Sequence, residues 1–180
     1  TSNLQRLNDA FDEVIMITGN HDLYYREKRE IHSIPMVDKY PNIHMINDGT
    51  EIIDDCAFVP WLVEDEHKKL KELNVKYIFG HFELPHFFMN AMVQMPDHGE
   101  IKAEAFGGIE TVFTGHFHKR QVQRNIHYIG NCFPHNYADA ADDQRGMMVL
   151  GWGEDPEYFS WPDQPRYRVY QLSDLLQHTE

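Results

Sequence analysis

Three apolar segments of this sequence end in the same way, with a glycine followed by side chains that can bind metal. The segments VIMIT, VKYIF and IETVFT lead into GNHD at residues 19–22, GHFE at 80–83 and GHFH at 115–118. A glycine permits a sharp turn and a close backbone approach where a strand leaves a sheet. In open α/β sheets the residues that follow face the crevice at the carboxyl ends of the strands, where ligands bind. We therefore predict that one amide and three imidazoles converge there. They belong to Asn20, His81, His116 and His118.

The predicted ligands are amide oxygen and imidazole nitrogen, with no thiolate. Imidazole suits Zn²⁺, Fe²⁺ and Mn²⁺, and oxygen donors shift the preference toward manganese or iron. The two histidines of GHFH can direct imidazoles to two neighbouring ions. Two ions about 3.5–4 Å apart can hold the attacking and leaving oxygens of a phosphate ester and acidify a bridging water. His21 directly follows a predicted ligand and is expected to point elsewhere, giving a proton or hydrogen bond to the phosphate or the leaving oxygen.

Each motif taken singly has an ordinary structural alternative. Asn-His-Asp after a strand can cap a helix or shape a turn, and for a single motif we weigh the two interpretations about equally. Three such motifs in one order, each after a predicted buried strand, favour the metal site.

The composition is that of an acidic chain with enough apolar residues for a core. It has 180 residues, 42% of them apolar, and a formal net charge of −13. The apolar share argues against disorder, and no apolar run is long enough to cross a membrane. The acidic balance repels nucleic acid, unless a metal ion or another chain supplies positive charge. Two widely separated cysteines and the lack of a recognisable signal peptide predict a reducing, cytoplasmic location.

The order of predicted elements indicates an α/β fold, in which strands and helices first alternate and strands then prevail. Predicted strands occupy residues 14–18, 43–46, 51–53, 56–62, 75–79, 109–114, 121–124, 126–129, 147–152, 158–161 and 167–170, and predicted helices occupy 1–11, 64–73 and 101–106. An Asp48-Gly49 pair between two of these strands predicts a hairpin. We expect a mixed central sheet, two packed sheets in all, with helices outside. Three prolines indicate a boundary between a domain at 1–161 and a segment or tail at 162–180.

In their order along the chain, GNHD, GH and GHFH resemble the last three blocks of the calcineurin-like metallophosphoesterase superfamily. The family pattern is DxH, GDxxD, GNHD/E, GH and GHxH. Further segments are similar to the recombination and repair nuclease subunits of tailed phages, relatives of the bacterial SbcD-type exonuclease. These segments are KYPN at residues 39–42, VPWL at 59–62, GHFEL at 80–84, HYIG at 127–130 and DQRG at 143–146. The resemblance runs from about Val14 to about Trp161, which is most of the chain.

The resemblance implies an α-β-β-α sandwich of two mixed sheets flanked by helices, and metal-dependent cleavage of DNA phosphodiesters as an exonuclease or endonuclease. It assigns Asn20, His81 and His116 to one of two divalent ions. It assigns His118 to the other ion, and assistance to the leaving group to His21. Mn²⁺ is expected ahead of Zn²⁺, Fe²⁺ or Mg²⁺. DNA, an SMC-like ATPase subunit and a second copy of the chain are the implied partners, in the host cytoplasm if the protein is encoded by a phage.

The chain departs from the family pattern at its start. The DxH and GDxxD blocks, which in the family complete the first metal and bridge the two ions, have no counterpart in the 18 residues before GNHD. The chain also opens without methionine and inside a predicted helix. We therefore expect an N-terminally truncated domain whose two-metal site is incomplete and inactive by itself. A longer parent protein is the simplest explanation, and completion by another polypeptide or an inactive version are the alternatives.

Three further residues are expected beside the site, where they would hydrogen-bond the metal-binding side chains or contact the substrate. They are Asp22, Glu83 and Arg145. Glu83 is expected to hydrogen-bond a ligand imidazole, with a solvated loop carboxylate as the alternative. Arg145 is a candidate phosphate contact, whereas an Arg–Asp turn pair is the commoner use of such a residue. Two other functions stay open for the whole chain: a generic metallophosphoesterase acting on small phosphate esters, and a non-catalytic fragment that binds DNA ends or a partner.

Overall fold

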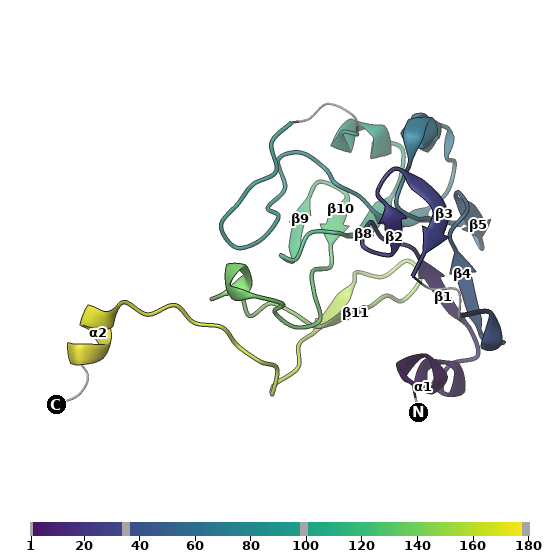
Figure 1. The fold of residues 1–180 in the computed structure, drawn as a ribbon. Coiled ribbons are helices and arrows are strands. Elements are labelled where there is room, and N and C mark those ends of the chain that lie inside the picture. Colours follow the sequence, from purple (N-terminus) through teal and green to yellow (C-terminus); the bar gives the residue numbers. More distant parts are fainter. Residues whose placement is uncertain (1, 34–36, 98–100, 178–180) are drawn as a thin grey trace.

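At the centre of the fold lies a mixed sheet of six strands. The computed structural model describes residues 2–33, 37–97 and 101–177, and Figure 1 shows their course. The strand order is β5-β6-β7-β8-β10-β9, with the four inner strands parallel and each edge strand antiparallel to its neighbour. The strands span Glu51–Ile53 (β5), Cys56–Val59 (β6), Tyr77–His81 (β7), Thr111–Gly115 (β8), Gln121–Gln123 (β9) and Ile126–Tyr128 (β10). The predicted α/β class with a mixed central sheet is confirmed.

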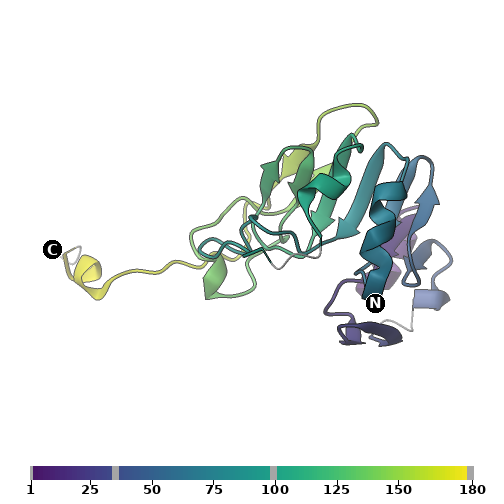
Figure 2. The same cartoon turned by 90° about the horizontal axis from the view of Figure 1, so that it is seen from above.

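One face of the central sheet carries the larger part of the hydrophobic core, under two short helices (Figure 2). The helices are η2 (Glu64–Glu72) and η3 (Ala103–Phe106). Leu70 and Phe106 from these helices are buried against Ile78 and Val112 of the sheet. The α-helices expected for the two segments are 3-10 helices instead. Each segment buries a single side chain, so packing does not impose the i, i+3, i+4 spacing of an amphipathic α-helix.

A two-stranded antiparallel sheet covers the opposite face of the central sheet. Its strands are β11 (Met147–Val149) and β12 (Glu157–Phe159). Met148 and Leu150 pack here against a buried cluster that includes Tyr77 and Phe113. This short pair is the second packed layer that the strand-rich end of the sequence predicted.

A separate parallel pair of strands lies beside the central sheet (Figure 1). It consists of β1 (Val14–Ile17) and β4 (Ile43–Ile46). The predicted hairpin from β4 to β5 is wrong, because β4 pairs with β1 while β5 pairs with β6. The hairpin that does form joins β5 to β6 through Asp54 and Asp55, whose φ angles are 47° and 62°. Aspartate tolerates this left-handed conformation, which a two-residue type I′ turn requires at both positions.

Shorter elements complete the N-terminal half of the chain. They are α1 (Asn3–Ala10), the antiparallel hairpin of β2 (Leu23–Tyr25) and β3 (Lys28–His32), and the 3-10 helix η1 (Val37–Lys39). The helix α1 confirms the first predicted element. It begins after Ser2, whose side chain accepts a hydrogen bond from the backbone N–H of Gln5, the arrangement expected of an N-cap serine. The β2–β3 hairpin follows GNHD directly and was not predicted.

The C-terminal part of the chain leaves the body of the fold (Figure 1). After the 3-10 helix η4 (Tyr137–Asp139) and the β11–β12 pair, the chain extends outward to the helix α2 (Leu172–Gln177). The strand expected at 167–170 does not form, and Val169 and Tyr170 are 76% and 64% exposed. The boundary between 1–161 and 162–180 stays a prediction. In the described parts of the chain, none of the helices has the length and apolar character needed to cross a bilayer.

Candidate metal centre

The topology brings the three strand ends of the sequence pattern to one place. β7 and β8 are parallel neighbours, and their register pairs His81 with Gly115. GHFE and GHFH therefore leave the central sheet at the same edge. The end of β1 reaches this edge from the separate pair of strands, where the backbone N–H of Trp61 donates to the carbonyl oxygen of Thr18 at 2.7 Å.

Side chains from the three strand ends meet around the amide oxygen of Asn20. His81 Nε2 lies 2.9 Å from Asn20 Oδ1, and His116 Nδ1 lies 3.2 Å from the same oxygen. The two imidazole rings contact each other edge to face, with centroids 5.2 Å apart. Two ring nitrogens, from segments up to 96 residues away in the sequence, thus lie within 3.2 Å of one amide oxygen.

Glycines make room for the central imidazole of this cluster. A Cβ atom on Gly19 would lie 2.8 Å from the His81 ring, and one on Gly115 would lie 3.1 Å from it. Real Cβ atoms do not approach other atoms at the first of these distances. The close backbone approach inferred for the glycines from the sequence therefore has a specific purpose, which is to admit the His81 ring between two strand ends.

The environment keeps both imidazoles neutral. Burial, the neighbouring His116 and the nearby His21 lower the pKa of His81 to about 3. Burial also lowers the pKa of His116, although the carboxylate of Glu83 acts in the opposite direction. A neutral imidazole keeps one ring nitrogen with a free electron pair, the form that binds metal ions.

Glu83 holds the far side of His116. Its Oε2 lies 2.9 Å from His116 Nε2 and 2.6 Å from a guanidinium nitrogen of Arg26. Metal-binding histidines commonly give their second ring N–H to a carboxylate, which fixes the ring and its tautomer. With Nε2 directed to Glu83, the nitrogen that His116 turns toward Asn20 is Nδ1.

His21 and Asp22 take different positions around the same turn. The Asp22 side chain accepts a hydrogen bond from the backbone N–H of Gly19 at 2.7 Å, and its own N–H donates to the Gly19 carbonyl oxygen at 3.1 Å. Asp22 therefore closes the turn that presents Asn20. His21 is exposed, yet near enough to His81 and His116 to lower the pKa of both.

His118 and Arg145 have their polar contacts elsewhere. His118 Nδ1 lies 3.3 Å from Asp139 Oδ1. Arg145 is completely buried, and its guanidinium contacts Asp139, Asp142 and the carbonyl oxygen of His118. The expectation that Arg145 binds a phosphate therefore needs correction, because its donor groups face protein atoms. Its pairing with Asp142, three residues earlier, is the Arg–Asp turn pair that stood as the alternative.

The Asn20 cluster supplies three of the donor atoms that one divalent ion needs. Neighbouring ligands of an octahedral ion with bonds of about 2.1 Å lie about 3.0 Å apart, close to the separations found around Asn20. Across the described residues, no group of three His, Cys, Asp or Glu side chains is arranged to hold a metal ion. The cluster takes its third donor from an amide. The predicted second ion stays a prediction.

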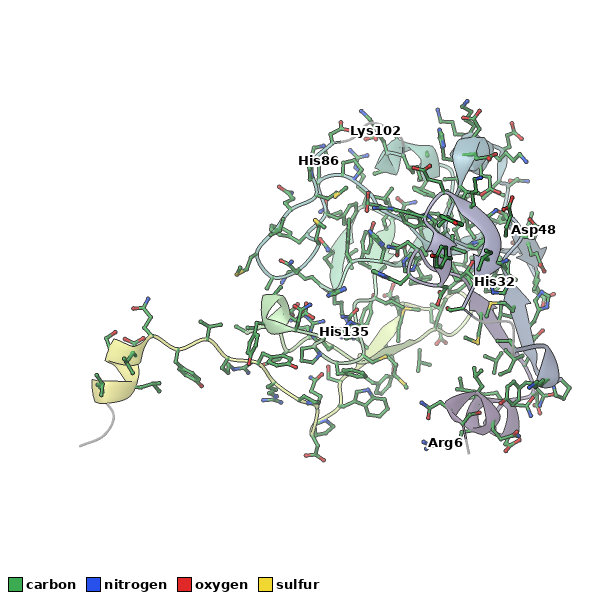
Figure 3. The ribbon with its side chains drawn as sticks, in the orientation of Figure 1. Arg6, His32, Asp48, His86, Lys102 and His135 are labelled. Atoms are coloured by element: carbon green, nitrogen blue, oxygen red, sulfur yellow. The ribbon has the colours of Figure 1, made fainter. Side chains whose placement is uncertain are left out.

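Two residues beside the cluster were not predicted from their chemistry. Trp61 places its ring 5.3 Å from the ring of His116, and the Arg26 guanidinium lies 5.0 Å above the Trp61 ring. Trp61 belongs to the apolar run at residues 56–62, which predicted a strand, and to VPWL of the family resemblance, but neither assigned it a place beside the cluster. Both residues line a cavity of about 500 Å³ that also reaches His81 and Glu83. Figure 3 shows His32, His86 and His135 on separate parts of the fold.

Comparison with known proteins gives one informative similarity. A scan against protein-family models finds no match. The chain is 30% identical over 157 residues to Exonuclease subunit 1 of Enterobacteria phage T4. The aligned region covers 82% of this chain and 44% of the phage T4 protein, so the chain spans less than half the length of this relative. Along most of its length, the chain is therefore similar to a phage exonuclease subunit.

Proposed function

We propose that this chain is part of a metal-dependent phosphodiesterase, the DNA nuclease subunit of a phage recombination or repair complex. The observation that carries the proposal is the meeting of Asn20, His81 and His116 at the ends of three strands. The similarity to a protein named as an exonuclease subunit supports the same direction. We propose a calcineurin-like domain as the wider fold, on the strength of the motif order.

Asn20 Oδ1, His81 Nε2 and His116 Nδ1 would hold the ion. When bound, a divalent cation supplies stabilisation of negative charge on the phosphate and a water of lowered pKa. Glu83 keeps the His116 ring oriented through Nε2. His21 is exposed beside the cluster, where its imidazole can give a proton to the leaving oxygen. We propose Mn²⁺ as the preferred ion and a second ion at His118.

The partners follow from the same proposal. DNA would be the substrate, an SMC-like ATPase the partner subunit, and a second copy of the chain a further partner. The net charge of −13 opposes DNA binding by this chain alone, so we expect divalent cations or other protein segments to supply the positive potential.

Binding of Mn²⁺ by the chain and by His81→Ala tests the metal site. The unmodified chain is expected to bind Mn²⁺ in equilibrium dialysis, and His81→Ala to lose affinity by at least about ten-fold because a ligand is gone. His44→Ala, a change at an exposed histidine of β4, is the matched control and should bind Mn²⁺ normally. Circular dichroism would verify that each variant folds. Equal Mn²⁺ content in the chain and in His81→Ala would overturn the site.

The cavity beside His81 supports a second candidate function, which is hydrolysis of small phosphate esters. Its volume of about 500 Å³ lies in the range of sites for small molecules. In a protein with a complete two-metal site, a metallophosphoesterase for small esters would hydrolyse a chromogenic phosphodiester and leave DNA intact. For the same protein, the nuclease proposal expects Mn²⁺-dependent cleavage of DNA.

A further inference from the structure

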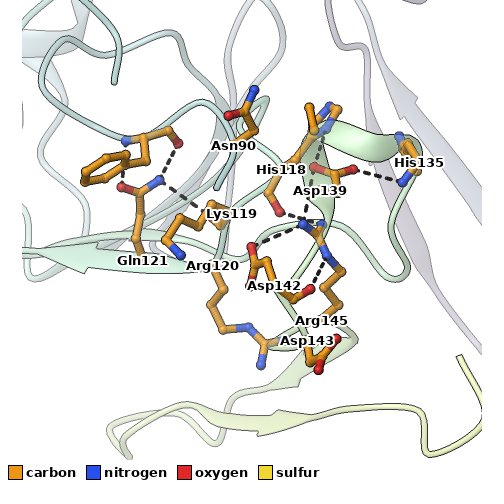
Figure 4. Close-up of polar contacts among 12 residues, drawn as sticks. Asn90, His118, Lys119, Arg120, Gln121, His135, Asp139, Asp142, Asp143 and Arg145 are labelled. Atoms are coloured by element: carbon orange, nitrogen blue, oxygen red, sulfur yellow. Dashed lines mark hydrogen bonds and ion pairs between the residues drawn. The ribbon is translucent and has the colours of Figure 1, made fainter. Parts of the chain in front are cut away.

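A buried cluster of charged side chains lies directly behind His118 (Figure 4). Arg145 has no exposed surface, and the side chain of Asp139 is also completely buried. Charges leave water at a high free-energy cost, which is recovered only when each charge is paired and hydrogen-bonded. A buried arginine of this kind needs a structural or functional reason.

The contacts of Arg145 join its own turn and Asp139 to the backbone of His118. Its Nη1 donates to the carbonyl oxygen of His118 at 2.9 Å. Its Nη2 donates to Asp142 Oδ2 at 3.1 Å and lies 3.3 Å from Asp139 Oδ1. Nε donates to the carbonyl oxygen of Asp142 at 3.0 Å. One guanidinium therefore fixes the backbone of His118 and the carboxylate that faces its ring.

Both carboxylate oxygens of Asp139 are engaged. Oδ2 accepts the backbone N–H of His135 at 2.9 Å, and Oδ1 lies 3.3 Å from His118 Nδ1. Burial by itself raises the pKa of Asp139, but the His135 N–H, the Arg145 charge and His118 outweigh it and lower the pKa. Because Oδ2 accepts the His135 N–H and Oδ1 faces the Arg145 guanidinium, groups that can only donate, Asp139 acts as an acceptor and the proton of a neutral His118 ring belongs on Nδ1.

We propose that Asp139, anchored by Arg145, is a positioning residue that holds His118 in the Nδ1–H tautomer and leaves Nε2 to bind a divalent cation. The His118 side chain is 32% exposed, while Asp139 occupies its Nδ1 side. The tautomer follows from the geometry alone. The cation-binding role of Nε2 rests on the proposed function. This assigns to Arg145 an indirect part in the site, through Asp139 and the His118 backbone.

Long-range ¹H–¹⁵N NMR spectra of the labelled, metal-free chain test the tautomer. The Nδ1–H form of His118 is expected in the unmodified chain. Asp139→Ala should abolish its dominance, because it removes both carboxylate oxygens and leaves Nδ1 without its acceptor. Asp143→Ala is the matched control: this aspartate pairs with Arg168 and should leave the His118 tautomer unchanged.

The possible results separate this inference from the wider proposal. An Nε2–H tautomer in the unmodified chain overturns the inference, and this spectrum decides the matter even if Asp139→Ala does not fold. A folded Asp139→Ala with an unchanged tautomer overturns it as well. Excess Zn²⁺, a diamagnetic probe, should shift the Nε2 signal of His118, and no shift would overturn its cation-binding role. The Mn²⁺ affinity of His81→Ala is measured separately by dialysis. Its outcome concerns only the proposed function.

Discussion

At the scale of single residues, the environment of His81 shows how little free space the cluster has. Gly19 and Gly115 lie directly against the His81 ring, and the ring of His116 contacts it edge to face. The centroid of the Trp61 ring lies 6.0 Å from that of His81. An imidazole confined in this way keeps its nitrogen directed at Asn20 without a large loss of side-chain entropy on binding an ion.

Gly19→Ala should displace the His81 ring. The added Cβ meets that ring at 2.8 Å, and overpacking of a filled site costs about 1–3 kcal/mol. We expect a loss of stability in this range by denaturant titration, together with weaker Mn²⁺ binding. Gly108→Ala, where an added Cβ meets no atom within 4 Å, should change neither quantity. Unaltered Mn²⁺ affinity in Gly19→Ala would show that the ring position is not required.

The residues that carry the motifs could be predicted from the sequence, and those that support them could not. Asn20, His81 and His116 each follow a glycine at a strand end, a pattern that is local in the chain. Asp139 reaches His118 from 21 residues away, through a segment without a periodic pattern. Nothing local distinguishes Asp139 from the other aspartates of this acidic chain.

At the scale of elements, Tyr128 connects β10 to the chain that follows β7. Its hydroxyl donates to the carbonyl oxygen of Phe82 at 2.8 Å and accepts the N–H of Leu84 at 3.2 Å. The ring is completely buried and stacks on Phe117. These contacts fix the backbone on both sides of Glu83.

Tyr128→Phe keeps the ring and removes the hydroxyl. Two buried backbone groups then lose a partner, which costs about 1–3 kcal/mol for each unsatisfied group. We expect a lower free energy of unfolding in urea, whereas Tyr24→Phe, at a tyrosine that is 73% exposed, should have no measurable effect. Equal stability of both variants would mean that the hydroxyl does not support the loop.

Strand positions were more predictable than strand partners. The apolar runs located β7 and β8 to within about two residues and gave the start of β6, although β6 ends at Val59 and not at residue 62. The Asp48-Gly49 pair predicted a hairpin between β4 and β5, but β4 pairs with β1. In this pairing Ile43 lies opposite Val14, which is 29 residues earlier in the sequence. Pairing between distant segments depends on packing that a local turn signal does not contain.

At the scale of the whole molecule, the described residues of the last segment are largely exposed. Arg168 still pairs with Asp143, and Tyr167 contacts Tyr137. Beyond them, Val169 and Leu172 are 76% and 72% exposed. Removal of a segment with so little buried surface should not change the stability of the body.

A chain that ends at Arg168 should melt within about 2 °C of the unmodified chain, since a loss below about 0.5 kcal/mol shifts the midpoint by no more than that. A chain that ends at Gly146 is the contrasting control. It lacks β11, β12 and the Met148 and Leu150 side chains that cover Tyr77, and should melt much lower. Differential scanning calorimetry gives both values. A large shift on removal of residues 169–180 would reveal a stabilising role for the C-terminal segment.

The amide and the two imidazoles come from different sheets: Asn20 follows β1, whereas His81 and His116 end or follow strands of the central sheet. An ion held by all three would join the β1–β4 pair to the central sheet, in addition to the hydrogen bond from the Trp61 N–H to the Thr18 carbonyl oxygen. Local opening of the β1–β4 pair and dissociation of the ion would then become a single event, with one rate and one free-energy change. Binding of an ion would therefore raise the free energy of local opening of the N-terminal part of the fold, as well as supply its chemistry.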